Sequence, residues 1–138
     1  MANDGFTKEE KAAMRDRAKE LKANATKEEE LAEVLKKIAA MSPADRAIAE
    51  RIHEIVLKAA PSLNAKTWYG MQAYFKDGKV VCFFQDAGKF KSRYSTFGFQ
   101  DAATIDDGEF WATSFAVLKV TPAVEKQVTA LVKRSVLS

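Results

Sequence analysis

The residues that could do chemistry in this chain are few and stand apart from one another. His53 is the only histidine and Cys82 the only cysteine. A catalytic or metal-binding histidine needs a carboxylate, a cysteine or a second histidine that converges on it, and no local motif supplies one. Cys82 falls in an apolar run, where a free cysteine behaves as a small hydrophobic residue. The sequence therefore gives no support for an enzyme, unless residues distant in sequence converge in the fold.

One acidic segment could bind a hard cation. Asp106, Asp107 and Glu109 surround Gly108, and cations such as calcium take oxygen ligands from loops of this kind. The spacing of a complete calcium-binding loop is absent, so an ordinary turn is the other interpretation. A second acidic run, at residues 28–30, is typical of the first turn of a helix.

A basic stripe could hold an anionic group. Lys89, Lys91 and Arg93 alternate with Phe90 and Tyr94, so a strand over this segment would place the three cations on one face. The whole chain has 22 lysines and arginines against 19 acidic residues, which gives a net charge of +3. Because nucleic-acid-binding domains carry a larger and clustered basic excess, we expect no nucleic-acid partner.

Length and composition indicate one globular protein. The chain has 138 residues, of which 47% are hydrophobic and 30% charged, and such values are typical of folded domains. A single cysteine excludes an internal disulfide framework. No run approaches the roughly 20 apolar residues that span a bilayer, and the first ten residues do not resemble a signal peptide. The sequence therefore favours a cytoplasmic protein without a membrane partner. It leaves the oligomeric state open.

Helices are expected at both ends of the chain. Thr7 followed by Glu10 is a capping-box pattern that predicts a helix to about residue 22. Its apolar stripe is thin, so residues 1–25 are interpreted as a charged N-terminal helical extension. Apolar residues at helical spacing predict further helices over 26–41 and 42–60, and a last helix that begins at Thr121-Pro122.

The middle of the chain predicts strands. Aromatic and β-branched segments with turn residues between them indicate strands over 66–69, 71–76, 79–85, 90–97 and 115–120. Asp77-Gly78 is a strong signal for a two-residue hairpin turn. The expected fold class is α+β: an antiparallel sheet of about five strands flanked by helices, in a single domain over residues 26–138.

The hairpin around Asp77-Gly78 has two predicted faces. A two-residue turn predicts that Phe75 lies opposite Val80 and that this register continues outward. One face then carries Met71, Ala73, Phe75, Val80, Cys82 and Phe84. Because these residues are all apolar, this face should pack against the helices. The other face is mixed and carries Gln72, Tyr74, Lys76, Lys79, Val81, Phe83 and Gln85. We expect it to be covered by the chain's own helices, by a partner or by a ligand.

The mixed face suggests where a ligand would bind. Aromatic side chains supply contact area and one charged group can orient a ligand. The candidate ligand-binding residues are Trp68, Tyr69, Gln72, Tyr74, Phe83 and Arg93. In this hypothesis the chain is a binding domain for an unidentified small molecule or protein, in which Arg93 orients an anionic group.

Three segments resemble the YdhG-like domain family, a bacterial group of largely unknown function. The segments are Leu57–Pro61, Thr67–Tyr74 and Asp77–Phe84, and they contain the Tyr-Gly-Met sequence at residues 69–71. The resemblance implies an α+β fold with an antiparallel sheet. One family member is regarded as a frataxin-like iron chaperone, so the resemblance also implies iron or another metal, held by exposed carboxylates, as the alternative function.

Overall fold

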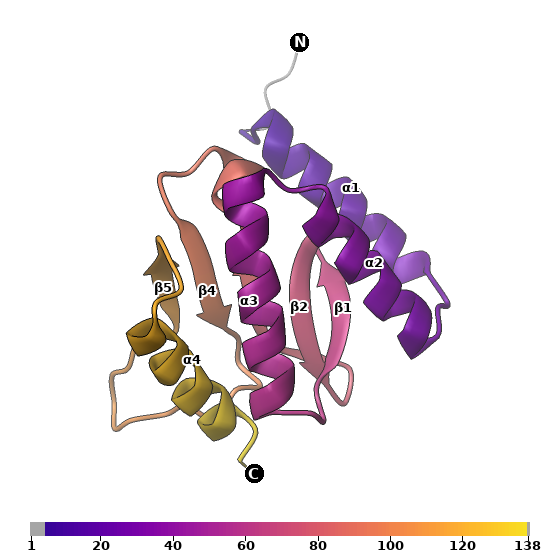
Figure 1. The fold of residues 1–138 in the computed structure, drawn as a ribbon. Coiled ribbons are helices and arrows are strands. Elements are labelled where there is room, and N and C mark those ends of the chain that lie inside the picture. Colours follow the sequence, from indigo (N-terminus) through magenta and orange to yellow (C-terminus); the bar gives the residue numbers. More distant parts are fainter. Residues whose placement is uncertain (1–4, 138) are drawn as a thin grey trace.

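The computed structural model describes residues 5–137 and confirms the α+β fold class. The helices are α1 (Lys8–Lys22), α2 (Lys27–Ala39), α3 (Pro43–Ala59) and α4 (Pro122–Ser135). The strands are β1 (Asn64–Trp68), β2 (Met71–Lys76), β3 (Lys79–Gln85), β4 (Ser95–Phe99) and β5 (Ser114–Val117). A short 3-10 helix, η1 (Ala87–Phe90), lies between β3 and β4. All neighbouring strands are antiparallel, in the order β1-β2-β3-β4-β5 (Figure 1).

The helices begin where the sequence predicts. Thr7 and Thr26 form capping boxes with Glu10 and Glu29, so that each pair satisfies two backbone N–H groups at a helix start. Ser42 and Thr121 cap α3 and α4 directly before a proline, which needs no hydrogen-bond partner at that position. Residues 1–4 of the expected extension lie outside the described residues. Within the described chain, no helix is long and apolar enough to cross a membrane.

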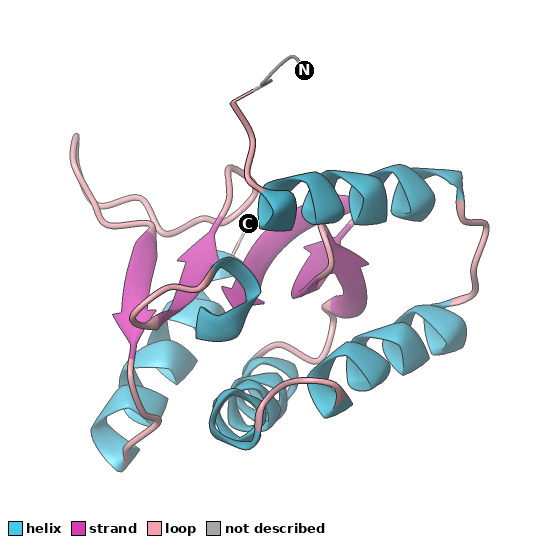
Figure 2. Cartoon of the chain, turned by 90° about the horizontal axis from the view of Figure 1, so that it is seen from above, coloured by secondary structure: helices cyan, strands magenta, loops and turns pink. Residues whose placement is uncertain are grey.

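The sheet lies between two unequal layers of helices. Helices α2, α3 and α4 cover one face, whereas α1 lies on the opposite side (Figure 2). The hydrophobic core lies on the first side and includes Val34, Ile52, Val56, Tyr74, Phe84, Phe97 and Val132. On α1 only Ala13 is buried. The face covered by the three helices is called the inner face below, and the opposite one the outer face.

The predicted register of the hairpin is correct only next to its turn. Phe75 pairs with Val80 as expected, but Tyr74 then pairs with Cys82 and not with Val81. Val81 is therefore the extra residue of a β-bulge, which shifts all later pairs by one position. As a result Gln72 and Tyr74 share the inner face with Cys82 and Phe84. The predicted division into faces is therefore wrong for β2, because Met71, Ala73 and Phe75 lie on the outer face.

The predicted strand over 90–97 is also displaced. Residues 87–90 form η1, Lys91 adopts a left-handed conformation with φ of 55°, and β4 begins only at Ser95. Lys89, Lys91 and Arg93 therefore do not alternate along one strand. The prediction of a basic stripe along a strand is therefore wrong.

Candidate functional site

The turn between β1 and β2 is the point where α1 contacts the sheet. Trp68 pairs with Met71, so Tyr69 and Gly70 form a two-residue turn, with φ of 53° and 77°. Positive φ at both positions defines a type I′ turn, which matches the twist of a hairpin. The carboxylate of Glu20 on α1 accepts hydrogen bonds from both turn residues, at 2.8 Å from the Tyr69 nitrogen and 3.0 Å from the Gly70 nitrogen.

Other contacts of α1 surround this turn. Arg17 forms an ion pair with Glu20 at 3.4 Å, and its guanidinium lies 5.7 Å from the centre of the Tyr69 ring. A Cβ atom at residue 70 would come within 2.4 Å of the Asp16 carboxylate, so both the backbone conformation and the close approach favour glycine there. The Tyr-Gly-Met segment thus holds α1 against the sheet.

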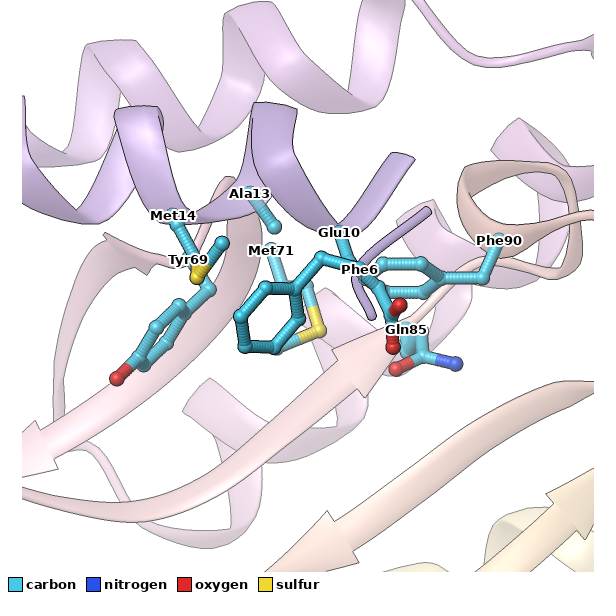
Figure 3. A pocket seen from close by; sticks show the side chains of 8 residues that line it. All are labelled: Phe6, Glu10, Ala13, Met14, Tyr69, Met71, Gln85 and Phe90. Atoms are coloured by element: carbon cyan, nitrogen blue, oxygen red, sulfur yellow. The ribbon is translucent and has the colours of Figure 1, made fainter. Parts of the chain in front are cut away.

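A groove of about 460 Å³ opens between the N-terminal half of α1 and the outer face of the sheet. Figure 3 shows the side chains that line it: Phe6, Glu10, Ala13, Met14, Tyr69, Met71, Gln85 and Phe90. The groove has the size of a small-molecule site, and such sites are mostly apolar with a few polar groups. Here the polar groups are Glu10 and Gln85. The Glu10 carboxylate is held by the Thr7 N–H at 2.9 Å.

An aromatic row continues from the groove across the outer face. The ring of Trp68 contacts Tyr69 edge-on at 5.1 Å and Phe83 at 5.3 Å between ring centres. The Phe83 ring in turn covers Gly98, where an added Cβ would come within 2.5 Å of it. Three of the predicted ligand-binding residues, Trp68, Tyr69 and Phe83, are therefore brought together, and Tyr69 is the one that also lines the groove.

Two other predicted residues lie in the interior. Gln72 and Tyr74 are fully buried on the inner face. Gln72 Nε2 donates hydrogen bonds to the carbonyl of Ala49 on α3 and to the Tyr74 hydroxyl, both at 3.0 Å. The Tyr74 hydroxyl is also 2.9 Å from His53 Nδ1. These side chains connect the sheet to α3, and the bulge at Val81 removes them from the surface on which the sequence placed them.

Arg93 lies apart from the groove. It follows η1 in an exposed segment, where its guanidinium stacks 5.2 Å from the centre of the Tyr94 ring. Among the residues that the structure describes, no arginine or lysine lines the groove. The predicted role of Arg93 in orienting an anionic group therefore finds no support in the position of this side chain.

The predicted metal-binding carboxylates remain on an exposed loop. Asp106, Asp107 and Glu109 lie between β4 and β5, with Gly108 at φ of 69°. Over residues 5–137, no three His, Cys, Asp or Glu side chains are grouped so that they could hold a metal ion. The Asp106 carbonyl accepts a hydrogen bond from Arg134, which ties the loop to α4.

The two residues with possible nucleophilic or base chemistry lie away from the groove. Burial raises the pKa of the Cys82 thiol far above its ordinary value, so the thiolate does not form near neutral pH. Burial lowers the pKa of His53 below 6.5, and Glu54 opposes this effect. His53 Nδ1 is already occupied by Tyr74. Neither side chain lines the groove.

A second cleft contains a pair of carboxyl groups. Asp45 and Asp86 line it together with Lys37 and Lys89. Burial and the charge of Asp45 raise the pKa of Asp86, and unequal carboxyl groups can serve as an acid and a base. However, Asp45 accepts the Gly88 N–H at 3.0 Å, and two lysines balance the charge. We therefore assign this pair a structural role, in which it joins the start of α3 to η1.

Comparison of this chain with protein-family models, with curated protein sequences and with solved structures finds no match.

Proposed function

We propose that this chain is a non-enzymatic binding domain that holds an elongated apolar ligand with a positively charged or hydrogen-bond-donating end. The observation that carries the proposal is the lining of the groove. Phe6, Met14, Tyr69, Met71 and Phe90 supply apolar surface, and Glu10 is the one charged residue among the lining residues.

Glu10 gives the groove its charge preference. Its carboxylate uses one oxygen to accept the Thr7 N–H, and a carboxylate can accept further hydrogen bonds. A cationic or donor group of the ligand would therefore bind at this end of the groove. The net charge of the chain is +3, so non-specific attraction would favour anions, and a preference for cations would come from the groove itself.

The test compares decylamine with decanoate, two ligands with equal alkyl chains and opposite charges. Trp68 is in ring contact with Tyr69, so its fluorescence reports binding in a Trp111→Phe background. We expect decylamine to bind more tightly than decanoate. Met14→Glu adds a negative charge to the groove, so it should weaken the binding of decanoate more than the binding of decylamine. A Trp68 signal that does not change with either ligand would refute the proposal.

The charge preference has a matched control. Glu10→Gln removes the charge and keeps the acceptor that the capping box requires, and we expect it to abolish the preference for decylamine. Glu29→Gln makes the same change in the capping box of α2 and should leave the preference unchanged. Equal effects of the two variants would show that the preference is a general charge effect, and the role of Glu10 would be wrong.

A further inference from the structure

The two edges of the sheet differ in their protection. At the first edge α2 packs against β1, and Lys66 of β1 forms an ion pair with Glu30 of α2 at 3.4 Å (Figure 1). At the other edge, β4 is the only strand among residues 5–137 that pairs with β5. An edge strand has a row of backbone N–H and C=O groups that can pair with another strand.

The β5 edge lacks several features by which proteins prevent pairing. Its sequence Ser114–Val117 contains no charged residue and no proline, and its register with β4 contains no bulge. The side chains of Ser114 and Ala116 are exposed and small, so they do not obstruct a neighbouring strand. The strand has only four residues, so its backbone bonds alone would give a weak association.

Exposed apolar side chains flank β5 on both sides. Phe110 is 94% exposed and Trp111 37% exposed before the strand, and Leu118 is 71% exposed directly after it. The connection that carries the two aromatic residues extends beyond the sheet at this edge (Figure 1). Contiguous exposed apolar surface is typical of protein–protein contacts, and these three side chains flank the same strand.

The charges on the two flanks of β5 identify the partner. The flank before the strand contains Asp106, Asp107 and Glu109, and the flank after it contains Lys119, whereas Glu125 of α4 pairs with Arg51. When a strand pairs antiparallel with a copy of itself, the N-terminal flank of each copy lies beside the C-terminal flank of the other. The acidic flank then meets the basic flank twice, and Leu118 approaches the aromatic pair.

We propose that β5 pairs antiparallel with β5 of a second copy of this chain, which gives one continuous sheet across a two-fold axis. Residues before and after the strand stabilise the interface, because apolar side chains become buried there and opposite charges are brought together. None of the described residues that line the groove under α1 belongs to β5 or its flanks, so the groove remains open in this dimer.

Sedimentation velocity of the full chain from micromolar to millimolar concentration tests the dimer. We expect a monomer–dimer equilibrium that weakens with added salt. Ala116→Lys places a like charge at the pairing strands of both copies and should abolish the dimer, whereas Ala130→Lys adds the same charge on α4 and should not. A monomer at every concentration would overturn the proposal, and so would a dimer that persists in Ala116→Lys.

A charge exchange tests the orientation of the two strands. Glu109→Lys and Lys119→Glu should each raise the dimer dissociation constant about fivefold at low salt, and the double variant should restore it. Additive weakening in the double variant would contradict antiparallel self-pairing. If Met14→Glu weakens the dimer and the β5 variants do not, the second copy binds in the groove under α1. That result also overturns the proposal.

Discussion

Glu20 Oε2 accepts the backbone N–H of Gly70 at 3.0 Å, although the two residues lie 50 positions apart in the chain. With the bond from Tyr69 to Glu20 Oε1, this contact joins α1 to the turn between β1 and β2. The Glu20 side chain is only 8% exposed. Hydrogen bonds to a charged and largely buried acceptor are stronger than those between neutral groups.

Replacing Glu20 should therefore release α1. We expect Glu20→Ala to lower the free energy of unfolding by about 1–3 kcal/mol, because two backbone donors lose their acceptor. Amide hydrogen exchange should accelerate throughout α1 and remain unchanged in α3. Glu33→Ala on the exposed face of α2 is the control and should change little. Unaltered exchange in α1 of the Glu20 variant would contradict the role of this contact.

Gly70→Ala should be more destabilising than Gly78→Ala. Both glycines have positive φ, of 77° and 79°, so both substitutions strain the backbone by about 1 kcal/mol. Only at residue 70 would the new methyl group meet other atoms, those of Asp16 and Lys89. Urea unfolding of the two variants measures the difference. Asp16→Ala should reduce this difference, because it removes a side chain that the new methyl group would meet. If the two glycine variants lose the same free energy of unfolding with and without Asp16→Ala, α1 moves aside at no cost and the prediction is wrong.

Stability should fall as the pH falls below about 6.5. The Tyr74 hydroxyl accepts from Gln72 Nε2 and lies 2.9 Å from His53 Nδ1, to which it donates in the tautomer of neutral His53 that carries its proton on Nε2. Burial lowers the pKa of His53 in the folded state, so the unfolded chain binds the proton more readily. The contribution of His53 is thus complete above its unfolded pKa and is lost as the pH falls toward its folded pKa.

Urea unfolding between about pH 5 and pH 8 measures this dependence. Because other groups also titrate, the quantity to compare is the difference between the wild type and His53→Gln. This difference should shrink as the pH falls. A difference that is constant with pH would mean that His53 has the same pKa in both states, contrary to the prediction.

Cys82 should react with a thiol reagent only after the chain unfolds. The side chain is fully buried and its thiol pKa is raised by burial. At pH 8 we expect modification by a disulfide reagent to be slow and to accelerate with urea in parallel with unfolding. Ala130→Cys on α4, in a Cys82→Ala background, exposes a thiol and should react at once. Rapid reaction of native Cys82 would show that the inner face opens locally.

Local signals in the sequence predicted most of the fold. The capping residues Thr7 and Thr26 give the helix starts, and Asp77-Gly78 gives a hairpin turn with φ of 51° and 79°. Each of these signals depends only on residues close in sequence, because the hydrogen bonds of a helix cap or a tight turn join residues a few positions apart. The antiparallel sheet of about five strands was also predicted, although β4 begins at Ser95 and not at residue 90.

The bulge at Val81 could not be predicted in the same way. Residues 80–84 are apolar at every position, so their alternation cannot indicate which side chains face the helices. The burial of Gln72 depends on an acceptor on α3, the Ala49 carbonyl, and no pattern in the sequence connects the two. One shifted pair moved Gln72 and Tyr74 from a predicted binding surface into the core.

The groove was also only partly visible in the sequence. Tyr69 was one of the predicted ligand-binding residues. Phe6, Glu10 and Phe90 were not, because no pattern in the sequence shows that their segments lie close to Tyr69 in the fold. Glu10 was recognised as part of a capping box, a local role that does not reveal its position at the groove. The displacement of β4 brings Phe90 to the groove, and the glycine at residue 88 is the one local signal of that change.

The burial of a single α1 residue, Ala13, makes the groove depend on an opening equilibrium. One wall of the groove belongs to α1, yet this helix is held mainly by polar contacts, so it can separate from the sheet at a lower free energy than global unfolding requires. A ligand then binds only the closed population, and its apparent dissociation constant is the intrinsic value divided by the closed fraction. Affinity for the groove can thus be tuned at Glu20, which touches no ligand.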